Sequence, residues 1–196
     1  MLPSVFTMDT TSPRLINIRF DLNTGNGFFE LKFDEPVQAD AIVLSHITIQ
    51  NRSRVVSDGE DVQSYTLTEN SGTKVITKTG TDHTIRIGYD DSASIKILSQ
   101  LATDIDSTFF SITTKTFFDT SYDENTATTI STEDAMQVIE YTPDTTDPYL
   151  KYFDIDMDSG ELTLYFNEPV DTSTLRVEEI RIQSLALRSA GESHRL

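Results

Sequence analysis

The chain has 196 residues and a formal net charge of −17, from 32 Asp plus Glu against 15 Lys plus Arg. This charge argues against nucleic acid as a partner, because binding it depends on basic side chains that release counterions. There is no Cys, and no apolar run approaches the roughly 20 residues of a membrane-spanning helix, so disulfides, thiolate metal sites and membrane insertion are not expected.

The first predicted elements are two strands joined by a turn. Alternation of apolar with polar residues is typical of half-buried antiparallel strands. The turn at residues 23–27 contains two Gly, and Pro36 predicts that the second strand leaves its sheet there because Pro donates no ladder hydrogen bond. The apolar face of the first strand is predicted to hold Ile16, Ile18, Phe20 and Leu22, and that of the second Phe29, Leu31 and Phe33.

Six further strands and one helix follow in the predicted order. The strands are expected at residues 42–50, 62–68, 73–78, 84–89, 109–114 and 136–141. Between the fourth and fifth of these, Ile95, Leu98, Leu101 and Ala102 recur at steps of three and four, which predicts a short helix within residues 90–102. Asp91 or Ser92 is the expected N-cap. Eight or nine strands suit two packed sheets, with the helix crossing between them.

Part of the chain repeats. Residues 9–15 return as residues 144–150 with five of seven identical, residues 27–37 match 160–170, and residues 47–50 match 180–183. Residues 5–7 are also similar to 140–142, which indicates the last strand of a preceding unit. A period this long indicates whole domains in series. We therefore expect the tail of one repeat at 1–12, a complete repeat at 13–147 and the first part of another at 148–196.

The order of these motifs resembles the Ig-like and cadherin-like repeats of large cell-surface proteins. It is most similar to bacterial Ig-like domains of S-layer proteins and adhesins, and to arrays in surface or flagellar-hair proteins of aquatic protists. The strongest matches are the Glu-Pro-Val segments at residues 33–37 and 166–170. The resemblance implies an all-β fold: an Ig-like antiparallel β-sandwich repeat with one short helix, followed by a partial second repeat.

Acidic residues at equivalent positions of the two copies are candidate calcium ligands, because Ca²⁺ takes six to eight oxygens from carboxylates, carbonyls and water. Ordinary turns, caps and solvated faces are the alternative. A second acidic group follows the predicted helix and includes Asp104 and Asp119. Asn51 begins an Asn-x-Ser glycosylation sequence. The candidate metal ligands are Asp9, Asp21, Glu35, Asp144, Asp147, Asp156 and Glu168.

These features predict a role in structure and none in catalysis. His46, His83 and His194 are isolated, and neither His-Glu-x-x-His nor Gly-x-Ser-x-Gly occurs. We expect a repeat unit of an extracellular structural or adhesive filament or cell-surface protein, a mechanical spacer rigidified by calcium. Its partners would be neighbouring repeats, other surface proteins or glycans. Alternatives are a carbohydrate-binding module that uses edge aromatics, and an acidic matrix protein that templates mineral.

Overall fold

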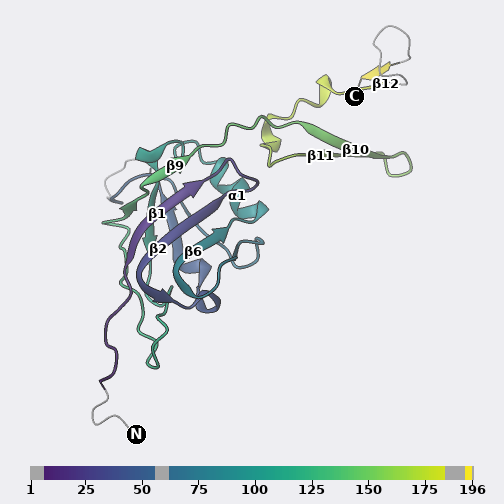
Figure 1. Ribbon diagram of the computed structural model, residues 1–196. Coiled ribbons are helices and arrows are strands. Elements are labelled where there is room, and N and C mark those ends of the chain that lie inside the picture. The colour runs from purple at the N-terminus through teal and green to yellow at the C-terminus, as the bar shows by residue number, and fades with distance from the viewer. Residues whose placement is uncertain (1–6, 56–61, 184–192, 196) are drawn as a thin grey trace.

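The computed structural model describes residues 7–55, 62–183 and 193–195, and Figure 1 shows their arrangement. Most of the regular structure up to residue 142 lies in two sheets. The first has the strand order β5-β6-β2-β1-β9, formed by Lys74–Val75, Gly80–Arg86, Phe28–Val37, Leu15–Asp21 and Glu140–Thr142. The second has the order β4-β3-β7-β8, formed by Ser64–Thr66, Ile47–Gln50, Phe109–Ile112 and Met136–Gln137.

Helical turns connect the strands, and two further strand pairs follow the two sheets. The helix α1 covers Tyr89–Lys96 and connects β6 of the first sheet to β7 of the second. The short 3-10 turns are Ala39–Ala41, Leu44–His46, Ile105–Ser107, Thr172–Thr174 and Val177–Glu179. The later strand pairs are β10 (Leu150–Asp156) with β11 (Glu161–Phe166), and β12 (Arg181–Gln183) with β13 (Ser193–Arg195).

One hydrophobic core holds the two sheets together. Phe29 of β2 meets Phe110 of β7 edge to face with ring centroids 4.7 Å apart, and Phe33 of β2 lies 4.9 Å from Phe117. The described residues of this core all lie between Leu15 and Tyr141. Residues 13–142 therefore form a two-layered, mainly antiparallel unit, called here the two-sheet body.

The predicted face of the first strand is correct except at Ile16. A register irregularity between Leu15 and Asn17 in the β1–β2 pairing puts Leu15 in the core and leaves Ile16 45% exposed. Ile18, Phe20 and Leu22 are buried as predicted. The error arises because a bulge changes which residues share a face, and simple alternation does not reveal it.

Several predicted boundaries are also wrong. The strand predicted at residues 42–50 is regular only over Ile47–Gln50, because 3-10 turns occupy the residues before it. The strand predicted at 84–89 is β6, which starts at Gly80 and ends at Arg86. The helix forms but ends at Lys96. Residues 5 and 6, part of the predicted strand of a preceding unit, lie outside the described residues.

Asp91 ties α1 to both sheets. Its side chain is 0% exposed, and its carboxylate accepts hydrogen bonds from the hydroxyls of Tyr65 at 2.7 Å, Ser71 at 2.6 Å and Thr73 at 2.5 Å. The predicted N-cap role of Asp91 is wrong, because the helix starts one turn earlier with Gly88 as N-cap and no side-chain cap. The buried carboxylate instead fixes where the helix lies.

The β10–β11 hairpin has the local geometry of the β1–β2 hairpin but lies outside the core. Leu150 pairs with Phe166 as Leu15 pairs with Phe33, with an irregularity directly after both Leu residues. In Figure 1 this hairpin lies beside the two-sheet body and not between its sheets. Among the described residues, no helix has the length and apolar character required to cross a membrane.

Candidate cation sites

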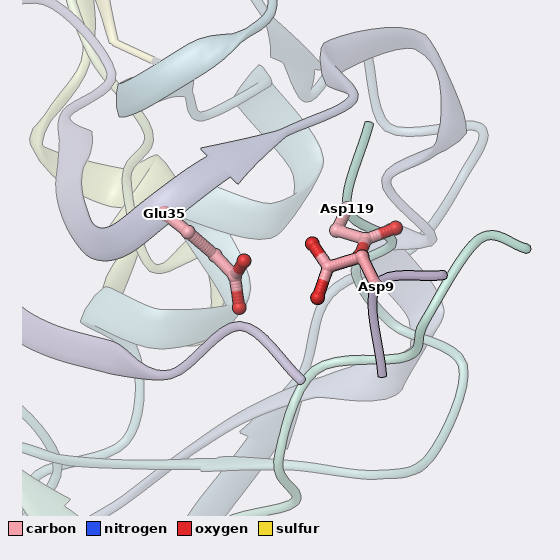
Figure 2. A group of neighbouring side chains, drawn as sticks. All are labelled: Asp9, Glu35 and Asp119. Atoms are coloured by element: carbon pink, nitrogen blue, oxygen red, sulfur yellow. The ribbon is translucent and has the colours of Figure 1, made fainter. Parts of the chain in front are cut away.

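Three carboxylates meet at the end of the two-sheet body where the chain enters. Asp9 belongs to the N-terminal segment, Glu35 to the end of β2 and Asp119 to the loop after β7 (Figure 2). One carboxylate oxygen from each lies within 4.8 Å of the others. We call this group the N-terminal acid pocket. It contains Asp9 and Glu35 from the predicted ligand set, and adds Asp119 from the second acidic group.

Asp119 is held rigidly within this pocket. It is 2% exposed, and its Oδ1 accepts from the backbone N–H groups of Ser121 at 3.1 Å and Asn125 at 2.9 Å. Its Oδ2 accepts from Asn125 Nδ2 at 2.9 Å. Burial raises the pKa of Asp119, but these donors outweigh burial and bring it below the usual value. Asp119 is therefore a fixed negative charge at neutral pH.

Glu35 has the least favourable surroundings of the three acids. Its Oε1 has no exposed surface and no hydrogen-bond partner among the described residues. Burial raises the pKa of Glu35, and the negative charges of Asp9, Asp34 and Asp119 raise it further. The pocket thus has a buried carboxylate oxygen and excess negative charge, a combination that favours a cation.

The counterparts of Asp9 and Glu35 in the second copy also meet, and they hold a cation. Lys96, the last residue of α1, places its Nζ 2.5 Å from Asp144 Oδ2 and 3.3 Å from Glu168 Oε2. The side chains of Asp144 and Glu168, called here the junction pair, are 20% and 10% exposed. Charge-assisted hydrogen bonds shielded from water are stronger than surface ion pairs.

Lys96 compensates much of the charge of the junction pair. Burial raises the pKa of Asp144, but the hydrogen bonds from Lys96 and from the backbone of Thr146 bring it below the usual value. Burial and the hydrogen bond with Asp144 raise the pKa of Glu168, and Lys96 opposes this in part. One ammonium thus serves two carboxyl groups, of which Asp144 is the more firmly ionised.

A second contact joins the same segments. Asn23, in the turn between β1 and β2, accepts hydrogen bonds through its Oδ1 from Thr145 N at 3.0 Å and Thr145 Oγ1 at 3.1 Å. The Thr146 hydroxyl lies 3.3 Å from the same oxygen. Two side chains of the two-sheet body, Asn23 and Lys96, therefore bind the segment that leads into β10.

The other predicted ligands have different places. Asp21 Oδ1 accepts from Asn23 N at 2.7 Å, and Asp156 Oδ1 accepts from Asp158 N at 2.8 Å, so both close the turn of their hairpin. Asp147 is exposed. None of these three belongs to the three-acid group found among the described residues.

The glycosylation prediction at Asn51 conflicts with burial. Asn51 is 6% exposed, and its Oδ1 accepts from Gln63 N at 3.1 Å. A glycan on Nδ2 would have to displace these packed neighbours. Glycosylation at Asn51 stays a prediction.

The exposed aromatic pair of the second hairpin has no aromatic counterpart in the first hairpin. Tyr152 and Tyr165 stack on β10 and β11 with ring centroids 4.3 Å apart, and both are exposed. Their counterparts on β1 and β2 are Asn17 and Lys32. Phe117 is fully buried and packs on Phe33 in the core.

Comparison with protein-family models, curated proteins and solved structures finds no match to this chain. Sequence reasoning missed Lys96 as the partner of the junction pair. Lys96 precedes Asp144 by 48 residues and Glu168 by 72, and no spacing pattern connects them. The repeated Asp and Glu were the available signal, and they identified only the acidic half of the contact.

Proposed function

We propose that the chain is a section of an extracellular structural or adhesive protein built from tandem Ig-like β-sandwich modules. In this proposal residues 13–147 are one module and residues 148–196 begin the next. The module is a mechanical spacer whose role depends on how firmly it is attached to its neighbour. The acidic charge of −17 keeps such a rod soluble and extended.

The observation that carries this proposal is the contact between the two-sheet body and the segment 144–168. Lys96 binds the junction pair, and Asn23 binds Thr145, so the connector is held at two points. Contacts from Lys96 and Asn23 leave this connector less free to bend than a polar linker of the same length. A firm junction suits a spacer.

The exposed face of the second hairpin also supports the proposal. Phe20 in β1 is 1% exposed, whereas its counterpart Ile155 in β10 is 43% exposed. Leu162 and Leu164 of β11 line a groove of about 1190 Å³, and a smaller one that they share with Ile180 and Ile182. In a complete module a sheet equivalent to β4-β3-β7-β8 would cover this face.

Calcium is the competing proposal for the N-terminal acid pocket. Three carboxylates supply only part of the six to eight oxygen ligands that Ca²⁺ takes, so water or a neighbouring segment would supply the rest. Chelation tests it directly. Calcium at 100 times its Kd would stabilise the folded chain by about 2.7 kcal/mol. If EDTA changes the melting temperature by less than about 2 °C, the proposal that calcium rigidifies the spacer is wrong.

The spacer proposal is tested by measuring whether the second hairpin moves with the body. In ¹⁵N relaxation, residues 150–166 should show the rotational correlation time of the two-sheet body. Lys96→Met should shorten it for the hairpin alone, because the methionine cannot donate to the junction pair. Lys74→Met, an exposed lysine on β5, is the matched control and should change nothing. Independent tumbling of the hairpin in the unmodified chain would refute a rigid junction.

A further inference from the structure

The surface that binds Lys96 is present twice in the chain. Asp144 Oδ1 accepts from Thr146 N at 2.9 Å, and Asp9 Oδ1 accepts from Thr11 N at 2.9 Å, so both Asp-Thr-Thr segments make the same turn. In each copy the Glu of the Glu-Pro-Val motif lies beside that Asp. One of these two surfaces is occupied by a lysine of the body.

The other surface lacks the equivalent contacts. Around Glu35 the charges that shift the pKa are all negative, whereas around Glu168 the positive Lys96 opposes the shift. Glu35 Oε1 is buried without a partner among the described residues. Among the described residues no side chain bonds to Thr10, whereas Asn23 accepts from its counterpart Thr145. Within the part of the chain that the structure describes, the pocket therefore has the acceptors of the junction but no ammonium beside Glu35.

The donors lie at the other end of the two-sheet body. The chain enters near the N-terminal acid pocket, and α1 lies toward the end from which the chain leaves for β10 (Figure 1). Asn23 and Lys96 are therefore presented away from Asp9 and Glu35. In this chain those donors already bind residues 144–168, so a head-to-tail series of modules would use the pocket as the acceptor for the module before it.

We propose that the N-terminal acid pocket receives a lysine ammonium from the module that precedes residues 13–147, in the way that the junction pair receives Lys96. This inference rests on the proposed tandem architecture and names the partner of its open end. An ammonium has three N–H donors, and the pocket brings one oxygen from each of three carboxylates within 4.8 Å of one another. Asp119 makes this copy of the surface more acidic than the junction pair.

The ammonium fits the pocket better than Ca²⁺ does. Asp119 already accepts four hydrogen bonds from Ser121 and Asn125, which leaves few lone pairs for a metal that needs six to eight oxygens. A lysine donor needs only one acceptor per N–H. The same Asp and Glu types bind an ammonium at the junction, which is direct precedent within this chain.

The test uses the intact chain and methylammonium chloride as the probe, with side-chain carboxyl ¹³C shifts as the readout. The Glu35 signal should move and saturate near about 10 mM, the range for a single small cation with few contacts. Tetramethylammonium chloride at equal ionic strength has no N–H donor and should leave it unchanged. Glu168 is the internal control, because Lys96 already occupies its site.

Lys96→Ala separates this inference from the proposed junction. In that variant methylammonium should also shift Glu168, with a half-saturation within about threefold of that at Glu35. If Glu168 responds in the variant and Glu35 does not respond in either protein, the pocket is no ammonium site although the junction stands. If calcium chloride moves Glu35 below 1 mM and methylammonium does not, the pocket is a divalent-cation site and the inference is overturned. Glu35→Gln should abolish the response, whereas Glu30→Gln on the same strand should preserve it.

Discussion

Replacing Asp91 by alanine should destabilise the two-sheet body severely. The carboxylate is fully buried, and it accepts from four hydroxyl groups and from the backbone N–H of Thr68. Removing a buried acceptor costs about 1–3 kcal/mol for each donor left unsatisfied. Hydroxyls can rotate to other acceptors, as Ser71 Oγ can toward Thr68 O at 3.1 Å, so the expected loss is about 4 kcal/mol.

The assay is urea unfolding followed by circular dichroism, with Asp90→Ala as the matched control. Asp90 neighbours Asp91 on α1 and is exposed, so its loss should cost about 0.5 kcal/mol through the helix dipole alone. Asp91→Asn keeps one acceptor oxygen and should fall between the two. At about 2–4 °C per kcal/mol, Asp91→Ala should melt about 12 °C lower. A loss below about 1 kcal/mol would contradict the claim that this carboxylate fastens the helix.

The same network sets a pH dependence. Burial raises the pKa of Asp91, but hydrogen bonds from Ser71, Thr73, Tyr65 and Thr68 bring it below the usual value. Because the folded pKa is the lower one, the stabilisation is complete above the unfolded pKa and is lost as pH falls through the folded pKa. The unmodified chain should therefore lose stability steeply below about pH 4, and Asp91→Ala should show a flatter acid limb.

Three other outcomes are expected. Gly88→Ala should lower the free energy of unfolding in urea by about 3 kcal/mol, because the added Cβ would lie 1.8 Å from Ser71 O. In Gly160→Ala the added Cβ meets open space, so only the positive φ should cost about 1 kcal/mol. Burial, then Asp104 and Asp144, raise the pKa of Tyr141 to about 12, so stability should fall between about pH 10 and 12, and the phenolate absorbance of the folded chain's Tyr141 should appear only near pH 12. Glu35→Gln should raise the melting temperature at neutral pH, with the gain vanishing in acid, because the raised pKa of Glu35 marks a carboxylate that folding disfavours. An unchanged melting temperature would contradict the unfavourable surroundings assigned to Glu35.

Local patterns in the sequence predicted the hairpins well and the connections poorly. Phe29, Leu31 and Phe33 alternate on β2 and are buried, because one face of that strand meets the core throughout. The prediction that Ile16 is buried was wrong because the irregularity after Leu15 depends on how β1 pairs with β2. The residues before Ile47 form helical turns, although their apolar run has the composition of a strand. Pairing and turn geometry come from distant parts of the chain, which a local window does not contain.

For the candidate sites, too, the sequence predicted the repeated local motifs but not the long-range contacts. The repeat identified Asp9 with Glu35 and Asp144 with Glu168, because equivalent positions are visible in the sequence itself. Asp119 joins the first pair across 84 residues from Glu35, and Lys96 joins the second across 48 residues from Asp144. Neither sequence separation follows from the periodicity of a helix or a strand. The fold alone places the end of α1 at the exit of the body, and it thereby supplies the cation.

One short helix couples the stability of the body to its attachment. Asp91 lies in the first turn of α1 and Lys96 at its last residue, so the buried carboxylate and the bridging ammonium are separated by about 7.5 Å of helix axis. In the proposed spacer, tension between modules passes along the backbone from Thr142 to Leu150, and Lys96 restrains this connector against α1. Through Tyr65 on β4 and Thr73 just before β5, Asp91 in turn fixes α1 to both sheets. In that proposal, a lysine on a loosely held helix would restrain the connector less.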